Sequence, residues 1–237
     1  MPTGNTYNGP TLSCNDGAGS GRMFFRQIPA KGDRNFAYLI GDEAAREAAI
    51  VDASYAPEQV WAGAQARGLN ARYVISTHSH TDHIVGNDYL LERTQAVEVM
   101  HESAPRACRV RVKDNEELSL GNLRLRFLHT PGHVPDHVCV LVEGKLLTGD
   151  LLFVGKIGGT GPHFPGSDPR QQWESLQRLA RLDPATEVWP GHDYGVAPSS
   201  TLGREIATNP FLLCKTYEEF LYLKDHWAEF KKAHGIA

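Results

Sequence analysis

Four side chains that can bind a metal ion stand within six positions of this chain, in the segment T-H-S-H-T-D-H (77–83). The segment continues A-R-Y-V-I-S-T (71–77), whose β-branched residues predict a buried strand. A chain that turns after a strand can direct several nearby side chains at one point in space. The segment therefore predicts a metal site at a strand end, and its spacing differs from that of the helical HExxH zinc site.

Metal-binding residue types recur at the ends of other predicted strands. They occur in H-T-P-G-H (129–133), T-G-D (148–150) and P-G-H-D (190–193). One loop histidine is more often a solvated side chain than a ligand, but the repetition at several strand ends favours a single constellation. Imidazole and carboxylate suit Zn, Fe or Mn, and the absence of cysteine from these motifs favours an open catalytic site over a closed structural one.

Composition limits the partners of the chain. With 237 residues, 41% of them hydrophobic and 22% charged, the chain suits one soluble domain with a sizeable core. A net charge of −4 without a basic run argues against nucleic acid as a partner. No apolar run is long enough to span a membrane and the first residues lack a signal-peptide pattern, so we expect a cytoplasmic protein with no membrane contact.

The first 22 residues are rich in Gly, Asn, Ser and Thr, and we interpret residues 1–22 as a flexible lead-in outside the fold. Residues 23–237 are expected to form one domain. Turn signals separate short apolar runs, which predict strands within 24–54, 71–77, 96–100, 116–129, 137–153 and 187–193. Helices are predicted over 57–68, 84–93, 169–182 and 216–233. This order favours an α/β fold, an αββα sandwich of two mixed sheets with helices on the outer faces.

At these motifs the sequence resembles the metallo-β-lactamase superfamily, from about residue 24 to 214. Within it, the chain is similar to the branch that contains glyoxalase II (hydroxyacylglutathione hydrolase) and persulfide dioxygenase. The resemblance implies one or two divalent metal ions, with two favoured and Zn, Fe and Mn left open. Its pattern assigns His78, His80 and His133 to a first metal, Asp82, His83 and His192 to a second, and Asp150 to a bridge between them.

The leading functional hypothesis is a hydrolase of the glyoxalase II type. Such an enzyme cleaves a thioester, such as an S-acylglutathione, with a metal-bound hydroxide, and Asp82 and Asp150 would be its catalytic carboxylates. Two departures from glyoxalase II stand in the sequence. The segment that usually carries basic and aromatic glutathione contacts reads G-K-I-G-G-T-G-P-H-F (155–164), and the long C-terminal helical extension is missing or much reduced.

A persulfide dioxygenase is the alternative, because H-D-Y-G-V-A-P-S-S-T-L-G-R-E-I-A-T-N-P-F-L (192–212) is similar to the tail of that family. There, the positions of His78, His133 and Asp150 would hold a single iron, although an arginine typical of the family is absent near Gly158–Gly159. A third hypothesis is a non-catalytic, metal-binding member of the fold.

Three further residues are candidates for substrate contacts. Tyr194 follows His192–Asp193, while Lys156 and His163 belong to the glycine-rich loop. Each also has a plain structural interpretation, as an aromatic residue covering the core or as a solvated loop residue. The expected partner is a small thiol-derived molecule, and a homodimer is left open.

Overall fold

The first half of the chain builds one six-stranded sheet in the order β1-β2-β3-β4-β5-β6. The computed structural model describes residues 23–236, so the predicted lead-in lies outside the described residues. Antiparallel pairing joins β1 to β2 and β2 to β3, and parallel pairing joins the remaining strands. The strands are β1 (Met23–Pro29), β2 (Phe36–Asp42), β3 (Glu47–Val51), β4 (Asn70–Ile75), β5 (Val97–His101) and β6 (Val110–Val112).

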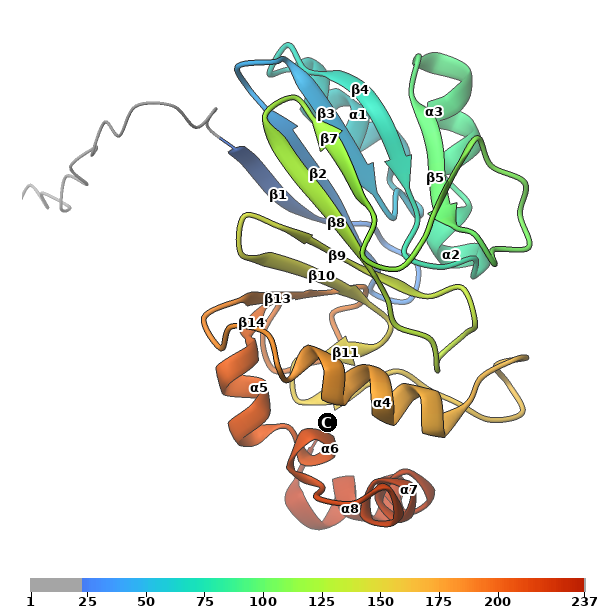
Figure 1. Cartoon of the computed structure of the whole chain (residues 1–237), viewed down its shortest axis with the longest axis vertical. Helices are drawn as coiled ribbons and strands as arrows, with labels where there is room; N and C mark the ends of the chain where they lie inside the picture. The colour runs from blue at the N-terminus through green and yellow to red at the C-terminus, as the bar shows by residue number, and fades with distance from the viewer. Residues whose placement is uncertain (1–22, 237) are drawn as a thin grey trace, which may run out of the picture.

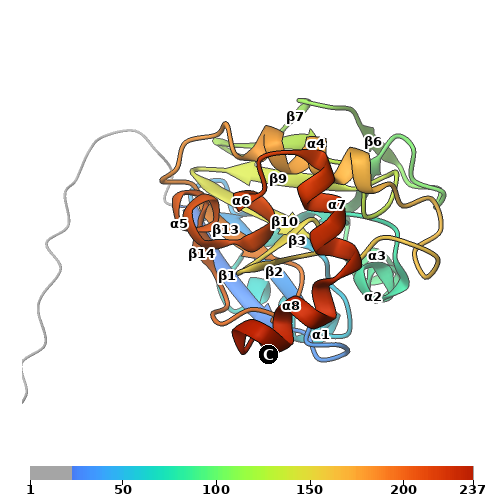
Figure 2. The same cartoon turned by 90° about the horizontal axis from the view of Figure 1, so that it is seen from below.

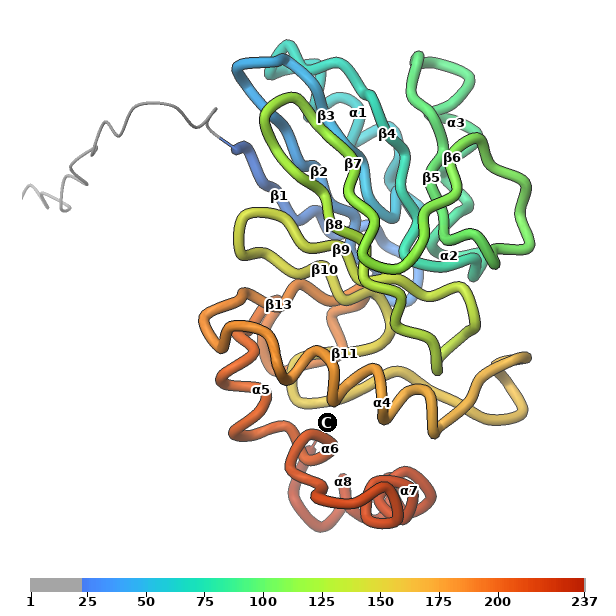
Figure 3. The backbone as a smooth tube through the Cα atoms, in the orientation of Figure 1, coloured from blue at the N-terminus to red at the C-terminus, as the bar shows by residue number. Residues whose placement is uncertain are grey.

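The second half builds the other six-stranded sheet, in the order β14-β13-β10-β9-β8-β7. Only β10 and β13 pair in parallel. The strands are β7 (Glu117–Leu120), β8 (Leu123–His129), β9 (Val138–Val142), β10 (Lys145–Gly149), β13 (Glu187–Pro190) and β14 (Ser200–Thr201). A small hairpin, β11 (Leu152–Phe153) and β12 (Lys156–Ile157), follows β10. Figure 3 traces this succession from the blue first sheet to the red C-terminal helices.

The two sheets pack against each other, and helices cover their outer faces (Figure 1). Between the sheets, Tyr38 and Ile40 of β2 share a buried cluster with Phe127 of β8 and Val140 of β9. Burial of such apolar surface is the main term that stabilises the sandwich. The αββα fold predicted from the sequence is therefore confirmed.

On the outer face of the first sheet lie α1 (Pro57–Gln65), α2 (Thr81–Ile84) and α3 (Asn87–Arg93). Val60 of α1 and Leu90 of α3 share a core with Ile50 and Val74 of the sheet. The sequence predicted one helix over 84–93, but the chain breaks between α2 and α3. The reason lies at Gly86, where a Cβ atom would come within 2.5 Å of the Ser54 carbonyl oxygen, so this turn packs directly on backbone.

The outer face of the second sheet carries α4 (Pro169–Leu179), α5 (Leu202–Thr208), α6 (Pro210–Leu213), α7 (Tyr217–Asp225) and α8 (Trp227–His234). The single helix predicted over 216–233 is divided at His226, so that Trp227 packs on Phe211 with ring centroids 4.7 Å apart. Seen from below, α7 runs beside α4 (Figure 2), and the two helices contact each other. Among residues 23–236, no helix is both long and apolar enough to cross a membrane.

Candidate metal centre

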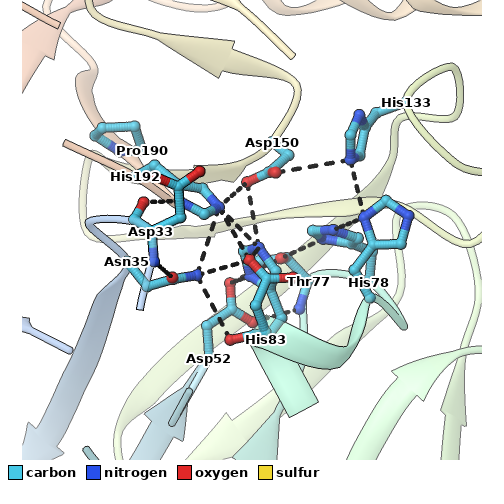
Figure 4. A network of polar contacts seen from close by, with 12 residues as sticks. Asp33, Asn35, Asp52, Thr77, His78, His83, His133, Asp150, Pro190 and His192 are labelled. Atoms are coloured by element: carbon cyan, nitrogen blue, oxygen red, sulfur yellow. Dashed lines mark hydrogen bonds and ion pairs between the residues drawn. The ribbon is translucent and has the colours of Figure 1, made fainter. Parts of the chain in front are cut away.

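The candidate ligands predicted at strand ends come together at one edge of the sandwich, between the two sheets (Figure 4). The turn after β4 supplies four of them, and the segments after β8, β10 and β13 supply one each. Three overlapping groups have ligand atoms close enough for a metal ion: His78, His80 and His133; His78, His83 and Asp150; Asp82, His83 and His192. The structure thus brings all seven side chains into one site.

The first group is made of three histidine nitrogens. His80 Nδ1 lies 3.0 Å from His78 Nε2 and 3.1 Å from His133 Nε2. His78 and His133 are buried, while His80 is partly open toward a cavity. Nitrogen lone pairs crowded at this distance repel one another unless a proton or a cation lies between them.

We call Asp82, His83 and His192 the second group. It joins two histidines to a carboxylate. His83 Nε2 and His192 Nε2 are 3.3 Å apart. Asp82 Oδ2 lies 3.4 Å from His192 Nε2 and 3.6 Å from His83 Nε2. Two imidazoles and one carboxylate form an open ligand set suited to a catalytic divalent cation.

Asp150 stands between the two groups and turns one oxygen toward each. Its Oδ2 lies 3.6 Å from His133 Nε2, whereas its Oδ1 lies 3.3 Å from both His83 Nε2 and His192 Nε2. Oδ1 is buried and has no hydrogen-bond partner within the described residues. A buried carboxylate oxygen without such a partner is costly, and a cation in the second group would satisfy it.

The outward-facing ring nitrogens determine which atom each histidine presents to the site. His133 Nδ1 donates to the carbonyl oxygen of Gly159 at 2.7 Å, and His192 Nδ1 donates to that of Asp33 at 2.8 Å. Because a carbonyl only accepts, both Nδ1 atoms carry the proton, and the neutral ring then presents a lone pair at Nε2. Such outer contacts are typical of histidines that bind metal.

Asp52 is the partner of the outward-facing ring nitrogen of His83. It follows β3 with a φ of +48°, and its Oδ2 lies 2.9 Å from His83 Nδ1. Its other oxygen accepts from the Thr77 backbone N–H at 2.8 Å, which ties the end of β3 to the turn after β4. Sequence analysis did not single out Asp52, although a carboxylate at the end of a predicted strand was the available signal.

Asn35 was also missed. It stands in the turn before β2, is buried, and donates from Nδ2 to Asp82 Oδ2 at 2.9 Å. One amide at the start of an apolar run carries no metal signature, so no sequence pattern indicated this contact.

His137 lies behind the bridging position. Its ring is fully buried, Nδ1 contacts Thr130 Oγ1 at 2.9 Å, and Nε2 accepts from the Asp150 backbone N–H at 3.1 Å. Gly149 has a φ of +46°, and a Cβ atom there would lie 2.6 Å from His137 Nε2. The glycine of T-G-D is therefore required where β10 delivers Asp150.

Charge divides the site into two parts. Burial lowers the pKa of His78 and His133, which favours neutral rings in the first group. In the second group burial alone would lower the pKa of His192, but the carboxylates of Asp150 and Asp82 raise it to about 9. These carboxylates therefore favour positive charge in the second group, which suits a bound cation.

Two adjoining cavities open beside the ligands. A cavity of about 230 Å³ is lined by His80, His133 and Asp150 together with Phe153, Phe164 and Tyr194. A second one, of about 470 Å³, shares Phe153 and Tyr194 and adds the cations Arg34, Lys156 and Lys231. Small ligands commonly occupy concave sites of this kind, with a few polar groups fixing their orientation.

The three candidate substrate contacts have different positions. Tyr194 lines both cavities and donates from its hydroxyl to Asp33 Oδ2 at 2.5 Å. Lys156 lines the larger cavity and donates from Nζ to the Tyr194 carbonyl oxygen at 2.7 Å. His163 is exposed and lines neither cavity; its neighbour Phe164 faces the site instead, with its ring 4.8 Å from that of His133.

The C-terminal helices contribute more to the site than the sequence suggested. Trp227 and Lys231 of α8 form part of the wall of the larger cavity. This contribution comes from the short α7–α8 pair, in the region where the sequence predicted a last helix. The sequence could not show that this pair folds back toward the metal ligands.

Comparison with known proteins places these features in a family. Residues 30–192 match the family model described as the Metallo-beta-lactamase superfamily. A cytoplasmic hydroxyacylglutathione hydrolase of Arabidopsis thaliana is 36% identical over 172 residues, covering 68% of this chain and 65% of that protein. The hydroxyacylglutathione hydrolase of Anaeromyxobacter dehalogenans is 39% identical over 166 residues, covering 69% of this chain and 63% of that protein. The chain spans less than two thirds of the length of these two relatives.

Solved structures with a similar fold include two that are at least 30% identical to this chain. ETHE1 from Myxococcus xanthus superposes with a TM-score of 0.79 at 35% identity, covering 86% of this chain and 91% of that chain. TTHA1623, solved in a di-iron-bound form, superposes with a TM-score of 0.68 at 30% identity, covering 79% of this chain and all of that chain (100%).

Proposed function

Because this chain belongs to the metallo-β-lactamase superfamily, we propose that it is a binuclear metallohydrolase that cleaves the thioester of a small thiol-derived substrate. The observation that carries the proposal is the placement of Asp150, with one carboxylate oxygen toward each group of ligands. The overall reaction adds water across the C–S bond and releases a carboxylic acid and a thiol.

Divalent cations held by the two groups would supply a water molecule of lowered pKa and would polarise the thioester carbonyl. The protein's own part is to hold its ligands still and to orient the water. Asp82 is half-buried, lines the smaller cavity and receives the amide of Asn35. Although burial alone would raise the pKa of Asp82, contact with His192 and His83 holds it well below its usual range, so the carboxylate is ionised and can orient water.

The larger cavity supports an anionic substrate. Arg34, Lys156 and Lys231 reach it from three separate elements of the chain, and Phe153 and Trp227 supply apolar walls. A peptide-like thiol with carboxylate ends, such as glutathione, would place its carboxylates near these cations and its thioester near the ligands. The printed names of the two hydrolase relatives support this substrate class.

Persulfide dioxygenase is the second candidate, favoured by the resemblance of residues 192–212 to the tail of that family. The contacts of this tail have a role that suits either reaction. Glu205 accepts from the Gly155 N–H at 2.8 Å, and Asn209 donates to the Lys156 carbonyl oxygen at 3.1 Å. The tail thus holds the turn that carries Lys156. Its resemblance to the dioxygenase family therefore bears on the wall of the cavity more than on the type of reaction.

The test pairs metal analysis with two assays. Purified protein with about two metals per chain and thioester hydrolysis supports the hydrolase. One iron per chain, with oxygen uptake on a glutathione persulfide, supports the dioxygenase. Full metal loading without either activity supports the third hypothesis, a non-catalytic member of the fold.

Two variants sharpen the comparison. Asp82 belongs only to the second group, so Asp82→Ala should remove one metal and abolish hydrolysis, whereas a single-iron dioxygenase would keep its iron and its activity. His133→Ala should abolish either reaction. The exposed His234 provides a matched control, since His234→Ala removes an imidazole far from the ligands in the sequence and in no metal group.

A further inference from the structure

Lys224 is a lysine of α7 that points into the protein. It is half-buried, and its Nζ donates to Gln172 Oε1 at 2.6 Å and, at 3.5 Å, to the carbonyl oxygen of Gly158. Burial lowers the pKa of Lys224 to about 8. An ammonium group withdrawn from water in this way depends on its protein acceptors, so the two hydrogen bonds fix its position.

Gln172 connects Lys224 to the Gly158–Gly159 loop beside the ligands. Its side chain is fully buried in α4, and Nε2 donates to the same Gly158 carbonyl oxygen at 2.9 Å. Lys224 and Gln172 therefore hold one backbone oxygen from two different helices. No side chain fits at Gly158, where a Cβ atom would lie 1.7 Å from the Asp150 carbonyl oxygen, so the loop is pressed against the backbone of the bridging residue.

The next carbonyl along the loop, that of Gly159, is hydrogen-bonded to His133. Gly159 O accepts from His133 Nδ1 at 2.7 Å and thereby sets both the tautomer and the direction of the ring. Gln172 also packs against Gly132, the residue before this ligand, because its backbone N and Cα lie 2.3 Å from where a Cβ on Gly132 would be. One buried residue thus contacts both the residue before His133 and the loop whose next carbonyl accepts from His133.

We propose that Lys224 and Gln172 are positioning residues of the first metal group: together they hold the Gly158–Gly159 segment, whose carbonyl orients His133 for metal binding. The short α7–α8 pair is then part of the metal centre as well as of the cavity wall. The inference rests on the metal centre of the proposed function and is independent of which reaction that centre performs.

The test measures metal binding to the apoprotein with Co²⁺ as the probe, by chelator competition and by the visible absorption of the bound ion. Lys224→Met and Gln172→Met should each weaken Co²⁺ affinity about 10-fold and change the absorption spectrum, as loss of an outer-shell partner typically does. Because both residues act on the same carbonyl, the double variant should resemble either single variant instead of showing the product of their effects.

Controls separate positioning from general stability. Lys232→Met removes an exposed cation of α8 and should bind Co²⁺ as the wild type does. Lys224→Arg keeps a cationic donor and should lie between wild type and Lys224→Met, and it serves in place of Lys224→Met if that variant fails to fold. A purely structural role would lower the melting temperature of the apoprotein and leave affinity and spectrum unchanged.

Two results would overturn the inference alone. The first is wild-type affinity and spectrum in Lys224→Met or in Gln172→Met, and the second is independent, multiplying effects in the double variant. Failure of the wild-type apoprotein to bind Co²⁺ would instead overturn the proposed metal centre, and this inference with it.

Discussion

At the scale of single residues, Phe164 limits the space above the first ligand group. Its ring lies 4.8 Å from that of His133 and 6.0 Å from that of His80. It also occupies the position where a Cβ atom on Gly159 would stand, at 2.4 Å. Gly159 is thus explained by an aromatic side chain that lies against the backbone.

Phe164→Ala should widen the smaller cavity and favour bulkier acyl groups. We expect the ratio of kcat/KM for a long-chain thioester over that for a short-chain thioester to rise about 10-fold, the usual value of one or two methylenes in an apolar pocket. Steady-state kinetics with an acyl series measures this ratio. Phe164→Leu, which keeps most of the volume, is the matched control; an unchanged ratio in Phe164→Ala would show that substrate binds elsewhere.

His101 gives a pH dependence unrelated to the ligands. Its ring is buried and stacks on that of His129 with centroids 3.8 Å apart, and burial together with His129 lowers its pKa to about 4. Between pH 6.5 and 4 the unfolded chain therefore binds a proton that the folded protein does not. The free energy of unfolding should fall as the pH drops through this window, by at most about 3 kcal/mol from this residue.

Urea unfolding of the metal-free protein at pH 7 and pH 4.5 measures that loss. His101→Gln, which does not titrate, should lose less stability than the wild type over the same interval. His234→Gln replaces an exposed histidine of α8 and should follow the wild type. Equal losses in all three proteins would assign the pH dependence to other groups.

At the scale of elements, the sequence predicted what depends on local pattern. The strand before T-H-S-H-T-D-H, the β7–β8 pair about Gly121–Asn122 and the β9–β10 hairpin at Glu143–Gly144 are all present. Alternating apolar residues indicate strands, and glycine indicates tight turns. Both features can be recognised in the sequence. The short strands β6, β12 and β14 and the helices α5 and α6 were not predicted, because two to seven residues carry too little periodicity.

Helix α4 holds Gln172 against the ligand loop, and its first turn depends on Asp168. The Asp168 Oδ1 atom accepts from the backbone N–H groups of Arg170 at 2.7 Å and Gln171 at 3.2 Å. Asp168→Ala should lower the free energy of unfolding by about 1 kcal/mol, the usual worth of such a cap. Asp168→Asn keeps an accepting oxygen and should recover most of the loss in a chemical denaturation experiment. Equal stability of Asp168→Ala and wild type would show that the cap contributes nothing.

At the scale of the whole molecule, the site depends on distances in sequence that no local pattern encodes. His192 and Asp33 are 159 positions apart, and Asp33 joins the site only because the turn before β2 meets the end of β13. The ligand positions were predicted because each carries a metal-binding side chain at a strand end. Asp33 contributes a backbone carbonyl, and Lys231 has the sequence pattern of an ordinary surface lysine on a helix. Their place in the site therefore follows from the packing alone.

Because the ligands are drawn from both sheets, bound metal should stabilise the entire fold. A ligand that binds only the folded chain adds about 4 kcal/mol at a free concentration 1,000 times its dissociation constant. For a domain of this size, that corresponds to a melting temperature higher by roughly 8–16 °C. Thermal melts of chelator-treated protein, alone and after addition of Zn²⁺, Mn²⁺ or Fe²⁺, measure the shift and rank the ions.

The same melts test whether Asp150 couples the two ligand groups. If Asp150 bridges them, Asp150→Ala should lose most of the metal-dependent shift, since each group loses an oxygen ligand. Asp82→Ala, which affects only the second group, should retain the part due to the first. A full metal-dependent shift in Asp150→Ala would mean that each group binds its ion without the shared carboxylate, and the bridge would then have no role in holding the two sheets together.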